Sequence, residues 1–535
     1  MGTGVLAAAC RFTLPVVSGA LVSGCALVGP DFFTPYAPEK AAWTDAASPA
    51  ISQRTEPAIE WWKRLNDPVL NELVAIALQQ NLTLQIAAVR IFEARAQLGI
   101  VLGDRFPQSQ KVGFGYSYEK VSKNVGLTKT ISKLDPSFDP HLQAWSAGFD
   151  ASWELDIWGQ VRRGIQAATA NLVAQVADYD DVRVTLVGDV ATAYVTIRAL
   201  QAEIALARAN VKTQRESLDI TNLRFKDGVT TELDVQEATV LLNTTSAEIP
   251  ALQADLAKAE NALALLLGMP AGDVHSAVRQ PRAIPNPPAK IGVGIPADLL
   301  RRRPDIRAAE MRAAAQSAQI GIAEAELYPQ FGITGQIGFK ASDFATLFTS
   351  ASLTGLINPG ITWNFLNYGR IKNNVRVQDA RYQETIVQYQ QTVLKAYKET
   401  QDALVAFLKA KEEVVYLTRA ATAAKKAMGI ANDQYKEGTA DYSRVLNAQT
   451  AVLHTQQRLT QARASVVTNL IAIYKALGGG WEPGTNGPFL SAANRAEMES
   501  RTKWGQLLDP NAITPAERSL MPPTPSPRPF HHAGR

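Results

Sequence analysis

The stretch LRFKDGVTTELDV at residues 223–235 is repeated in altered form as DQYKEGTADYSRV at residues 433–445. In both stretches an aromatic residue, a lysine and an acid precede a glycine, and the two copies are 210 residues apart. The same offset relates WELDIWGQVR at 153–162 to WNFLNYGRIK at 363–372. Self-similarity at a fixed distance predicts that the chain contains two copies of one structural unit.

Each turn follows a long segment without proline, which runs from Gly159 to Gly228 in the first copy and from Gly369 to Gly438 in the second. Apolar residues recur at three-to-four spacing within residues 382–408, as on one face of a helix. At 1.5 Å per residue, each segment would form a helix of about 100 Å. Pairs of half-length helices are expected beside these long helices: residues 231–267 with 296–327, and residues 442–477 with about 69–104.

Four further segments alternate apolar residues with polar or small ones, which predicts β-strands. They are residues 111–120, 142–157, 331–340 and 355–366, all approximate. Alternating strands of about ten residues with aromatic residues at their ends are typical of transmembrane β-barrels; a soluble sandwich is the alternative. Four strands cannot close around a lumen, and open strand edges are not tolerated in lipid, so a membrane barrel requires several chains.

A second offset, of 222 residues, aligns Phe106-Pro107-Gln108 with Tyr328-Pro329-Gln330. The change of offset from 222 to 210 means that the first copy carries 12 extra residues between Pro107 and Trp153. We expect these extra residues in a loop, because loops tolerate insertions best.

The first residues read as a targeting segment. Residues 2–28 are apolar with a single charge, which predicts a signal peptide at 1–24. The segment ends in LVSGC at 21–25, which resembles the lipobox of bacterial lipoproteins, so we expect Cys25 to be acylated as a lipid anchor. Ala26 after the cysteine favours the outer membrane in lipoproteins of this type. An ordinary signal peptide with an incidental cysteine is the alternative.

The composition argues against other functional classes. A net charge of +4 over 535 residues is too weak a bias to indicate nucleic acid. Cys10 and Cys25 are the only cysteines, and beyond residue 28 no run of about 18 unbroken apolar residues occurs, so we expect no spanning helix. The histidines are scattered and no Ser/His/Asp arrangement, phosphate loop or HExxH motif occurs, so we expect no enzyme, cofactor or metal site. The arginines at 301–303 are expected to form an ion-paired or solvated face rather than a phosphate site.

Five motifs resemble the TolC family of outer-membrane factors, most closely its acylated, NodT-type efflux lipoprotein branch, over roughly residues 25–480. They are WWKRLNDPVLNELVAIALQQN, SWELDIWGQVRR, GIPADLLRRRPDIRAAE, AEAELYPQFG and the pair of glycine turns. The resemblance implies a mainly α, internally duplicated fold with a β membrane part. Four strands per chain and 12 per homotrimer would form an outer-membrane barrel, continuous with a long α-helical barrel in the periplasm.

The resemblance also implies a function. The protein would be lipid-anchored in the cell outer membrane and would conduct small molecules passively to the outside, as the exit duct of a tripartite efflux system. Its partners would be a periplasmic adaptor protein and an inner-membrane pump of the resistance-nodulation-division type. An exit duct of a type I protein secretion system is the main alternative, and a soluble periplasmic coiled-coil scaffold is a third hypothesis.

Together these observations divide the chain into six parts. They are a lipoprotein signal peptide (1–24), an N-terminal linker (25–66), a first repeat (67–268, tip at about 224–234), a proline-rich equatorial connection (269–295), a second repeat (296–478, tip at about 434–444) and a C-terminal equatorial segment with a disordered tail (479–535). In this division each glycine turn is a hairpin tip at the periplasmic end of the molecule.

The tips are the predicted contact with the adaptor, through Gly228, Val229, Thr230, Gly438, Thr439 and Ala440. A simple helix stop is the alternative, since glycine readily takes the positive φ with which helices end. The family commonly has an acid a few residues past the glycine, near the pore constriction. Asp234 keeps this acid, but Arg444 occupies the corresponding position of the second copy. Asp234 and Arg444 are therefore gate candidates, and an ion pair between them is one arrangement that would hold the tip closed.

Overall fold

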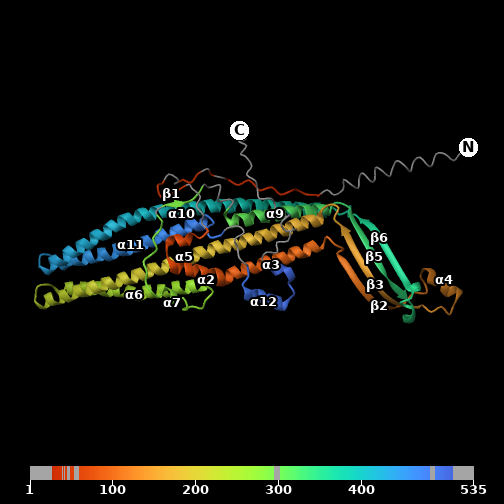
Figure 1. Cartoon of the computed structure of the whole chain (residues 1–535), viewed down its shortest axis with the longest axis horizontal. Coiled ribbons are helices and arrows are strands. Elements are labelled where there is room, and N and C mark those ends of the chain that lie inside the picture. Colours follow the sequence, from red (N-terminus) through yellow and green to blue (C-terminus); the bar gives the residue numbers. More distant parts are fainter. Residues whose placement is uncertain are drawn as a thin grey trace, which may run out of the picture.

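The structure is a computed structural model that describes residues 27–38, 40, 42–44, 48–52, 59–288, 290–294, 302–481 and 489–509. The expected signal peptide at 1–24, the anchor Cys25 and the tail beyond residue 509 lie outside these described residues. The molecule is a long rod, with a β-sheet at one end and two helical hairpin tips at the other (Figure 1).

Two unbroken helices run most of the length of the helical part, α5 (Gln160–Lys226) and α10 (Arg370–Lys436), each of 67 residues. Each begins after a glycine in the left-handed region, Gly159 at φ 84° and Gly369 at φ 83°. Shorter helices pack beside them: α6 (Glu232–Leu266) and α11 (Tyr442–Ala476), of 35 residues each, on the tip side, and α3 (Leu82–Gly103) and α9 (Pro304–Ala325), of 22 residues each, on the sheet side. The prediction of a long helix for each proline-free segment is confirmed.

The helices lie in a single curved layer. On the sheet side the order across the layer is α3-α5-α9-α10, and on the tip side it is α6-α5-α11-α10 (Figure 1). The strands follow the same order, so β2 continues the edge formed by α3, and β6 continues the edge formed by α10. One chain therefore forms a strip of wall with two free edges along its whole length.

Two predicted helices are shorter than expected. The prediction of one helix over 69–104 is wrong, because α2 (Pro68–Gln80) ends at Asn81 and α3 begins after it. Asn81 has extended backbone at ψ 124°, its side chain accepts a hydrogen bond from the Leu84 N–H at 2.8 Å, and it donates one to the Leu266 carbonyl at 2.8 Å. An asparagine N-cap thus starts a new helix where the periodicity alone continues.

The helix expected from Pro296 begins instead at Pro304. Arg303 before it has extended backbone, at φ −74° and ψ 123°, because a proline disfavours the helical conformation of the preceding residue. Residues 295–301 lie outside the described residues.

The end opposite the tips is one antiparallel sheet in the order β2-β3-β5-β6. Its strands are β2 (Ser109–Lys120), β3 (His141–Leu155), β5 (Gln330–Ala341) and β6 (Leu353–Thr362). The strand expected over 355–366 ends early, because Thr362 already pairs with Gln330, the first residue of β5. Trp363 beyond it donates its indole N–H to the Leu327 carbonyl at 3.0 Å instead of continuing the ladder.

The two connections at the far end of the sheet differ. The β2–β3 connection contains a helix, α4 (Gly126–Leu134), so the extra residues of the first copy are not a simple loop. The β5–β6 connection contains only the short 3₁₀ turns η2 (Phe344–Thr346) and η3 (Ser350–Ser352). The duplication is therefore regular in the wall and unequal at the outer end.

An equatorial belt surrounds the middle of the helices. It consists of η1 (Trp61–Leu65), α2, α7 (His275–Val278), α12 (Ala492–Arg501), η4 (Gly505–Leu508) and the two-residue parallel pair β1 (Ile51–Ser52) and β4 (Ile291–Gly292). The main hydrophobic core lies at this level, where Trp61 stacks on Tyr474 with ring centroids 5.2 Å apart. The segment after Trp481 contributes to the belt, since Asn494 bonds to Gln85 at 2.9 Å.

A buried arginine joins three helices at this belt. Arg303 is 7% exposed, and its guanidinium contacts Asp305 at 2.7 Å, Glu399 of α10 at 2.9 Å and the Ala476 carbonyl at the end of α11 at 2.9 Å. The expectation of an ion-paired face is confirmed for this arginine. The nearby carboxyl of Asp181 on α5 has its pKa raised to about 6, first by burial and then by the negative charge of Asp305.

The raised pKa of Asp181 makes stability depend on pH. Between about pH 3.9 and pH 6 the carboxyl ionises more easily in the unfolded chain than in the folded one, so the folded state loses stability as the pH rises through this window. We expect Asp181→Asn to stabilise the protein by about 2 kcal/mol at pH 7.5 and to have no effect at pH 3.5. Denaturant titrations of the assembled protein at both pH values measure this difference.

Asp219→Asn, at an exposed position of the same helix, is the matched control and should change stability little at either pH. A loss of stability for Asp181→Asn at pH 7.5 would show instead that Arg303 and Lys475 hold the ionised carboxylate favourably.

Candidate functional site at the helical tips

Both tips are built by the same backbone motif. Gly228 has φ +72° and Gly438 has φ +76°, values that residues with a Cβ rarely adopt. The Val229 N–H donates to the Arg224 carbonyl at 2.9 Å and the Gly228 N–H to the Phe225 carbonyl at 3.0 Å, which is the Schellman arrangement. The second tip repeats it, with Thr439 bonded to Gln434 at 2.9 Å.

The helices that leave the two tips start differently. Thr231 caps α6 in a capping box, in which its hydroxyl accepts from the Asp234 N–H and the Asp234 carboxylate accepts from the Thr231 N–H at 3.1 Å. The Thr230 hydroxyl also donates to this carboxylate. Burial acts to raise the pKa of Asp234, but the hydrogen bonds from Thr230 and Thr231 outweigh it and lower the pKa. Asp441 caps α11 without a side-chain hydrogen bond.

The two gate candidates are not brought together within the chain. Asp234 is half-buried and bonded locally to the two threonines, whereas Arg444 is exposed on α11. Among the residues that the structure describes, no ion pair joins Asp234 to Arg444, so this pair does not form within one chain, and its role at the gate stays a prediction. The carboxylate is used to cap a helix.

The two tips are instead joined by Arg224, which the sequence alone did not single out. Its guanidinium donates to the Tyr435 carbonyl at 2.7 Å and lies over the Tyr435 ring, 4.7 Å from the centroid. Tyr435 is buried with Tyr442, Val445 and Ala238 in a small core of its own. Gln434 stands at the position equivalent to Arg224 in the second copy, so this loss of symmetry was the only signal in the sequence.

The space around the two glycines is open. A Cβ at Gly228 would meet no described atom within 4 Å, and one at Gly438 would come only to 3.5 Å from the Arg224 guanidinium. Val229 is 61% exposed and Thr439 is exposed, while Thr230 and Ala440 are half-buried. The six predicted contact residues thus form two bare turns, held at a fixed separation by Arg224.

The sheet at the opposite end has one apolar and one polar face. In register across the strands, one face carries rows such as Tyr116, Trp145 and Ala341, and the other carries rows such as Gly115, Ser146 and Lys340. Val112 is 86% exposed and Ile357 is 80% exposed on the apolar face. Aromatic side chains lie near both of its ends: Tyr116, Tyr118 and Trp145 at the outer end, and Trp153, Trp158, Tyr328 and Trp363 near the helices. This is the pattern of a lipid-facing barrel wall with aromatic girdles.

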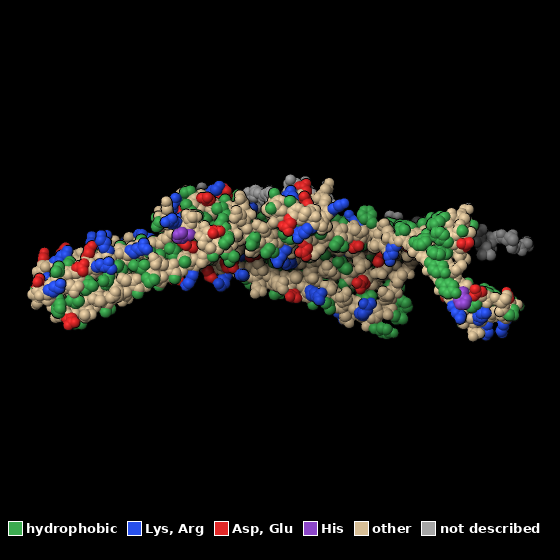
Figure 2. Space-filling view, turned by 90° about the horizontal axis from the view of Figure 1, so that it is seen from below, with side chains coloured by type: hydrophobic (Ala, Val, Ile, Leu, Met, Phe, Trp, Pro, Cys, Tyr) green, Lys and Arg blue, Asp and Glu red, His purple; other side chains and the backbone are tan. Residues whose placement is uncertain are grey.

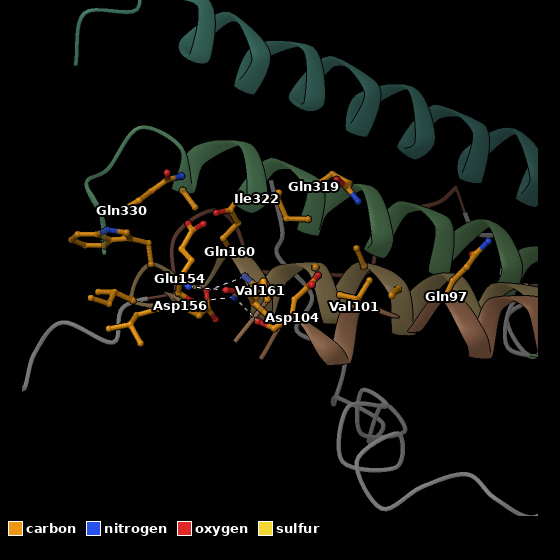
Figure 3. A pocket seen from close by; sticks show the side chains of 18 of the residues that line it. Gln97, Val101, Asp104, Glu154, Asp156, Gln160, Val161, Gln319, Ile322 and Gln330 are labelled. Carbon is orange, nitrogen blue, oxygen red and sulfur yellow. Dashed lines mark hydrogen bonds between the residues drawn. The ribbon is translucent and has the colours of Figure 1, made fainter. Parts of the chain in front are cut away.

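A cavity of about 520 Å³ lies where the sheet meets the helices. Its wall comes from α3, α5, α9 and the adjoining strand ends, with Asp104, Glu154 and Gln319 among the side chains directed toward it (Figure 3). Asp156 at its edge caps α5, accepting from the Val161 N–H at 2.9 Å, and pairs with Arg162 at 3.0 Å. The described residues contain no group of three or more metal-ligating side chains, here or elsewhere.

The first described residues are fixed at the same junction. The Val28 N–H donates to the Trp158 carbonyl at 3.1 Å, and the buried Arg163 donates to the carbonyls of Val28 and Gly29. Gly29 sits so close to Gly321 that a Cβ on it would approach the Gly321 Cα to 2.4 Å. The chain then runs along α9 and α10 toward the equatorial belt, where the Trp43 indole bonds to the Gly294 carbonyl.

The α5 helix is long and apolar enough, by length and composition, to cross a membrane, but 61% of its most apolar window is buried inside the protein. That burial identifies it as a core helix of the rod. A lipid-facing sheet continued by a rod of helices of about 100 Å defines a class of protein: an outer-membrane channel that extends into the periplasm.

Comparison with known proteins identifies the family within that class. Residues 73–269 and 295–479 match the family model of the outer membrane efflux protein, and the chain belongs to this family. The expected TolC-like fold, outer-membrane location and efflux function are thereby confirmed. The proteins it resembles are channels rather than enzymes.

The similarity extends over nearly the full length of its relatives. The chain is 30% identical over 481 residues to nodulation protein T of Rhizobium leguminosarum bv. trifolii, covering 88% of this chain and 98% of that protein. It is 29% identical to the toluene efflux pump outer membrane protein TtgI of Pseudomonas putida, covering 89% and 99%. The outer-membrane channel OprN has a TM-score of 0.79 at 32% identity, covering 85% of this chain and all of that one.

The Arg224 contact predicts a local change in stability. We expect Arg224→Met to keep the packing over Tyr435 but to lose the charge-assisted hydrogen bonds, at a cost of about 2 kcal/mol. Hydrogen exchange of the backbone around residues 432–438 should accelerate about 30-fold, while exchange at the equatorial belt stays unchanged.

Arg215→Met, at an exposed position of α5, is the control and should leave the tip amides unaffected. Unchanged exchange at residues 432–438 in Arg224→Met would mean that the core around Tyr435 holds the tips together without the arginine.

Proposed function

We propose that three copies of this chain form a closed channel, which receives small molecules from a periplasmic adaptor and an inner-membrane pump and releases them outside the cell. The observation that carries the proposal is the pair of free wall edges. Edge strands β2 and β6 have no partner on their outer sides among the described residues. In lipid such edges must be paired, and a ring of identical strips pairs each β2 with a neighbouring β6.

The helical edges support the same ring. Along α10, five exposed apolar side chains fall within about 40° of one another around the helix axis. They are Val387, Leu394, Val405, Tyr416 and Ile430. The opposite edge carries matching exposed stripes, with Leu82, Ile86, Val89 and Ile100 on α3 and Leu233, Val240 and Leu265 on α6. Two different edges that each expose apolar residues fit a head-to-tail ring, in which the edge of one copy covers the other edge of the next.

Three copies give 12 strands, since each chain supplies four. The polar, small-residue face of the sheet would then line the lumen and the aromatic face would contact lipid. Six glycine tips would surround the periplasmic opening. Asp234 and Arg444, near these tips, remain our candidates for residues that shape the gate, with any ion pair between them formed across subunits.

Transport through this duct would need no chemistry in the chain. The pump would supply the energy and the adaptor would connect the pump to the tips. The relatives' names include toluene efflux, which supports small molecules as the exported class. We propose a pump of the resistance-nodulation-division type as the partner on the strength of the family resemblance.

The proposed adaptor contact at the tips is tested by replacing the two glycines with a bulkier residue. We expect Gly228→Val and Gly438→Val to cost only about 1–2 kcal/mol each, because the strain lies in the positive φ, and an added Cβ meets no described atom at Gly228 and only ordinary contact with Arg224 at Gly438. The amount and assembly of the protein should stay unchanged, while cross-linking to the adaptor and resistance to exported compounds should fall.

Gly272→Val is a matched control, since Gly272 also has positive φ, at 96°, and an open Cβ position, but lies at the equatorial belt. If the tip variants assemble and transport like the wild type, the turns are helix stops and the docking proposal is wrong.

The lipid anchor is proposed at Cys25. Val28 and Gly29 are bonded at the junction of sheet and helices, which supports an acyl chain at Cys25 in the inner leaflet of the outer membrane. We expect mass spectrometry of the mature N-terminus to find a lipidated cysteine, which Cys25→Ser removes. Acylation contributes about 0.8 kcal/mol per buried CH₂ and is secondary to a closed barrel, so the exported variant should remain in the outer membrane. Its recovery as a soluble periplasmic protein would overturn the barrel assignment.

A further inference from the structure

The helix α4 stands at the outer end of the molecule, beyond the strands and opposite the tips (Figure 1). It exists only in the first copy, within the connection between Lys120 and His141. The helical wall and the tips do not use it, and it is not needed to complete the sheet. The channel architecture therefore does not account for the surface of α4.

The helix has two distinct faces. At 100° per residue, Leu127, Ile131 and Leu134 fall on one side. Leu127 is 76% exposed and Leu134 is 81% exposed. The polar side is fixed to the connection, because the Thr128 hydroxyl donates to the Ser122 carbonyl at 2.7 Å and the Ser132 hydroxyl donates to the Lys123 carbonyl at 3.3 Å. The helix is thus held so that its apolar side points outward.

The other connection at this end shows the contrast. Phe344 lies against Trp145, with ring centroids 5.1 Å apart, and Phe348 lies against Phe339 at 5.6 Å. Leu347 between them is fully buried. The second copy therefore buries Leu347 and holds two phenylalanines against its own sheet, although Phe344 stays 52% and Phe348 63% exposed, whereas Leu127 and Leu134 are more exposed still.

Lysines are exposed around the helix. Lys123 lies in the turn before it, Lys133 precedes the apolar Leu134, and Lys129 lies on the side opposite the apolar residues. Lys120 follows Tyr118 on the apolar face of β2, where a lysine reaches the headgroup level of a membrane. In Figure 2 this end of the molecule shows blue basic side chains beside green hydrophobic surface.

The acids of the same connection are bonded locally, and both also interact with the charge of Lys123. Asp135 accepts hydrogen bonds from the hydroxyl and N–H of Ser137, which lower its pKa, and Asp139 accepts from His141. The apolar face thus continues the lipid-facing surface of the sheet and is bordered by cationic groups. This is the composition of helices that lie in a membrane interface.

We propose that α4 lies on the outer surface of the outer membrane, with Leu127, Ile131 and Leu134 inserted at the headgroup boundary and Lys123 and Lys133 bound to phosphate groups of the outer-leaflet glycolipid, lipopolysaccharide. The proposal rests on the membrane position of the sheet and goes beyond the transport function. Each copy of the chain would hold one such helix, which fixes the depth and tilt of the barrel from the outside.

The test uses the full-length assembled channel with an environment-sensitive label, bimane, on Leu134→Cys. The channel is reconstituted in phosphatidylcholine vesicles, with or without phosphatidylglycerol or lipopolysaccharide, and the vesicles contain chain-brominated lipid as quencher. We expect the label at 134 to be quenched on the order of twofold more strongly than a label on Lys129→Cys, at the opposite side of the helix, when lipopolysaccharide is present. Replacing Lys123 and Lys133 by Gln should lower the ratio of bound to free helix about fivefold per lysine.

Each other outcome decides against the proposal. Equal quenching at 134 in phosphatidylcholine alone, with phosphatidylglycerol and with lipopolysaccharide would show that the lysines do not contribute to binding. Quenching as strong with phosphatidylglycerol as with lipopolysaccharide would show that the helix has no preference for the glycolipid. Weak quenching at 134 in all three vesicles, with position 112 quenched, would show that the apolar face lies outside the membrane. A label on Val112→Cys, on the lipid-facing sheet, separates these results from failure of the barrel itself, because only that failure leaves position 112 unquenched.

Discussion

The architecture depends on the positions at which its helices end. Four helices end in the same way, with Gly228, Gly268, Gly438 and Gly478 at positive φ and with Schellman hydrogen bonds behind each of them. The two outer glycines set the length of the rod, and the other two set the height of the equatorial belt. Because the helices beside the long ones must end at matched heights to pack, a shift of any stop by a residue or two would misalign the apolar faces along the wall. Backbone geometry at four points thus determines the register of the whole helical part.

The sequence was informative where a signal repeats over many residues. Long proline-free segments, period-two alternation and the two aligned copies predicted the rod, the strands and the membrane end, because each depends on dozens of residues acting together. The sequence was less informative where a single residue determines the end of a helix. Asn81 interrupts an otherwise continuous helical period, and its role as an N-cap depends on a carbonyl of Leu266, far away in the chain.

The tips show the same limit. From the sequence, Arg224 is an ordinary basic residue near a helix C-terminus, where a positive charge interacts favourably with the helix dipole. Its function in the structure comes from Tyr435 and Lys436, which lie more than 200 residues later. Conversely, the sequence alone allowed the carboxylate of Asp234 to pair with Arg444. In the structure this carboxylate accepts hydrogen bonds from three donors that are close to it in sequence. Local satisfaction took precedence over the long-range pair.

The free edges of the wall have a genetic consequence. A chain whose β2 and β6 both need a neighbour cannot complete its membrane part alone, so every channel would contain the products of three separate syntheses. A variant that folds but has one edge unable to pair would enter rings together with wild-type chains and prevent those rings from closing. With equal expression of both forms, only about one ring in eight would be wholly wild type. Edge mutations should therefore behave as dominant, whereas mutations that prevent the strip from folding at all should be recessive.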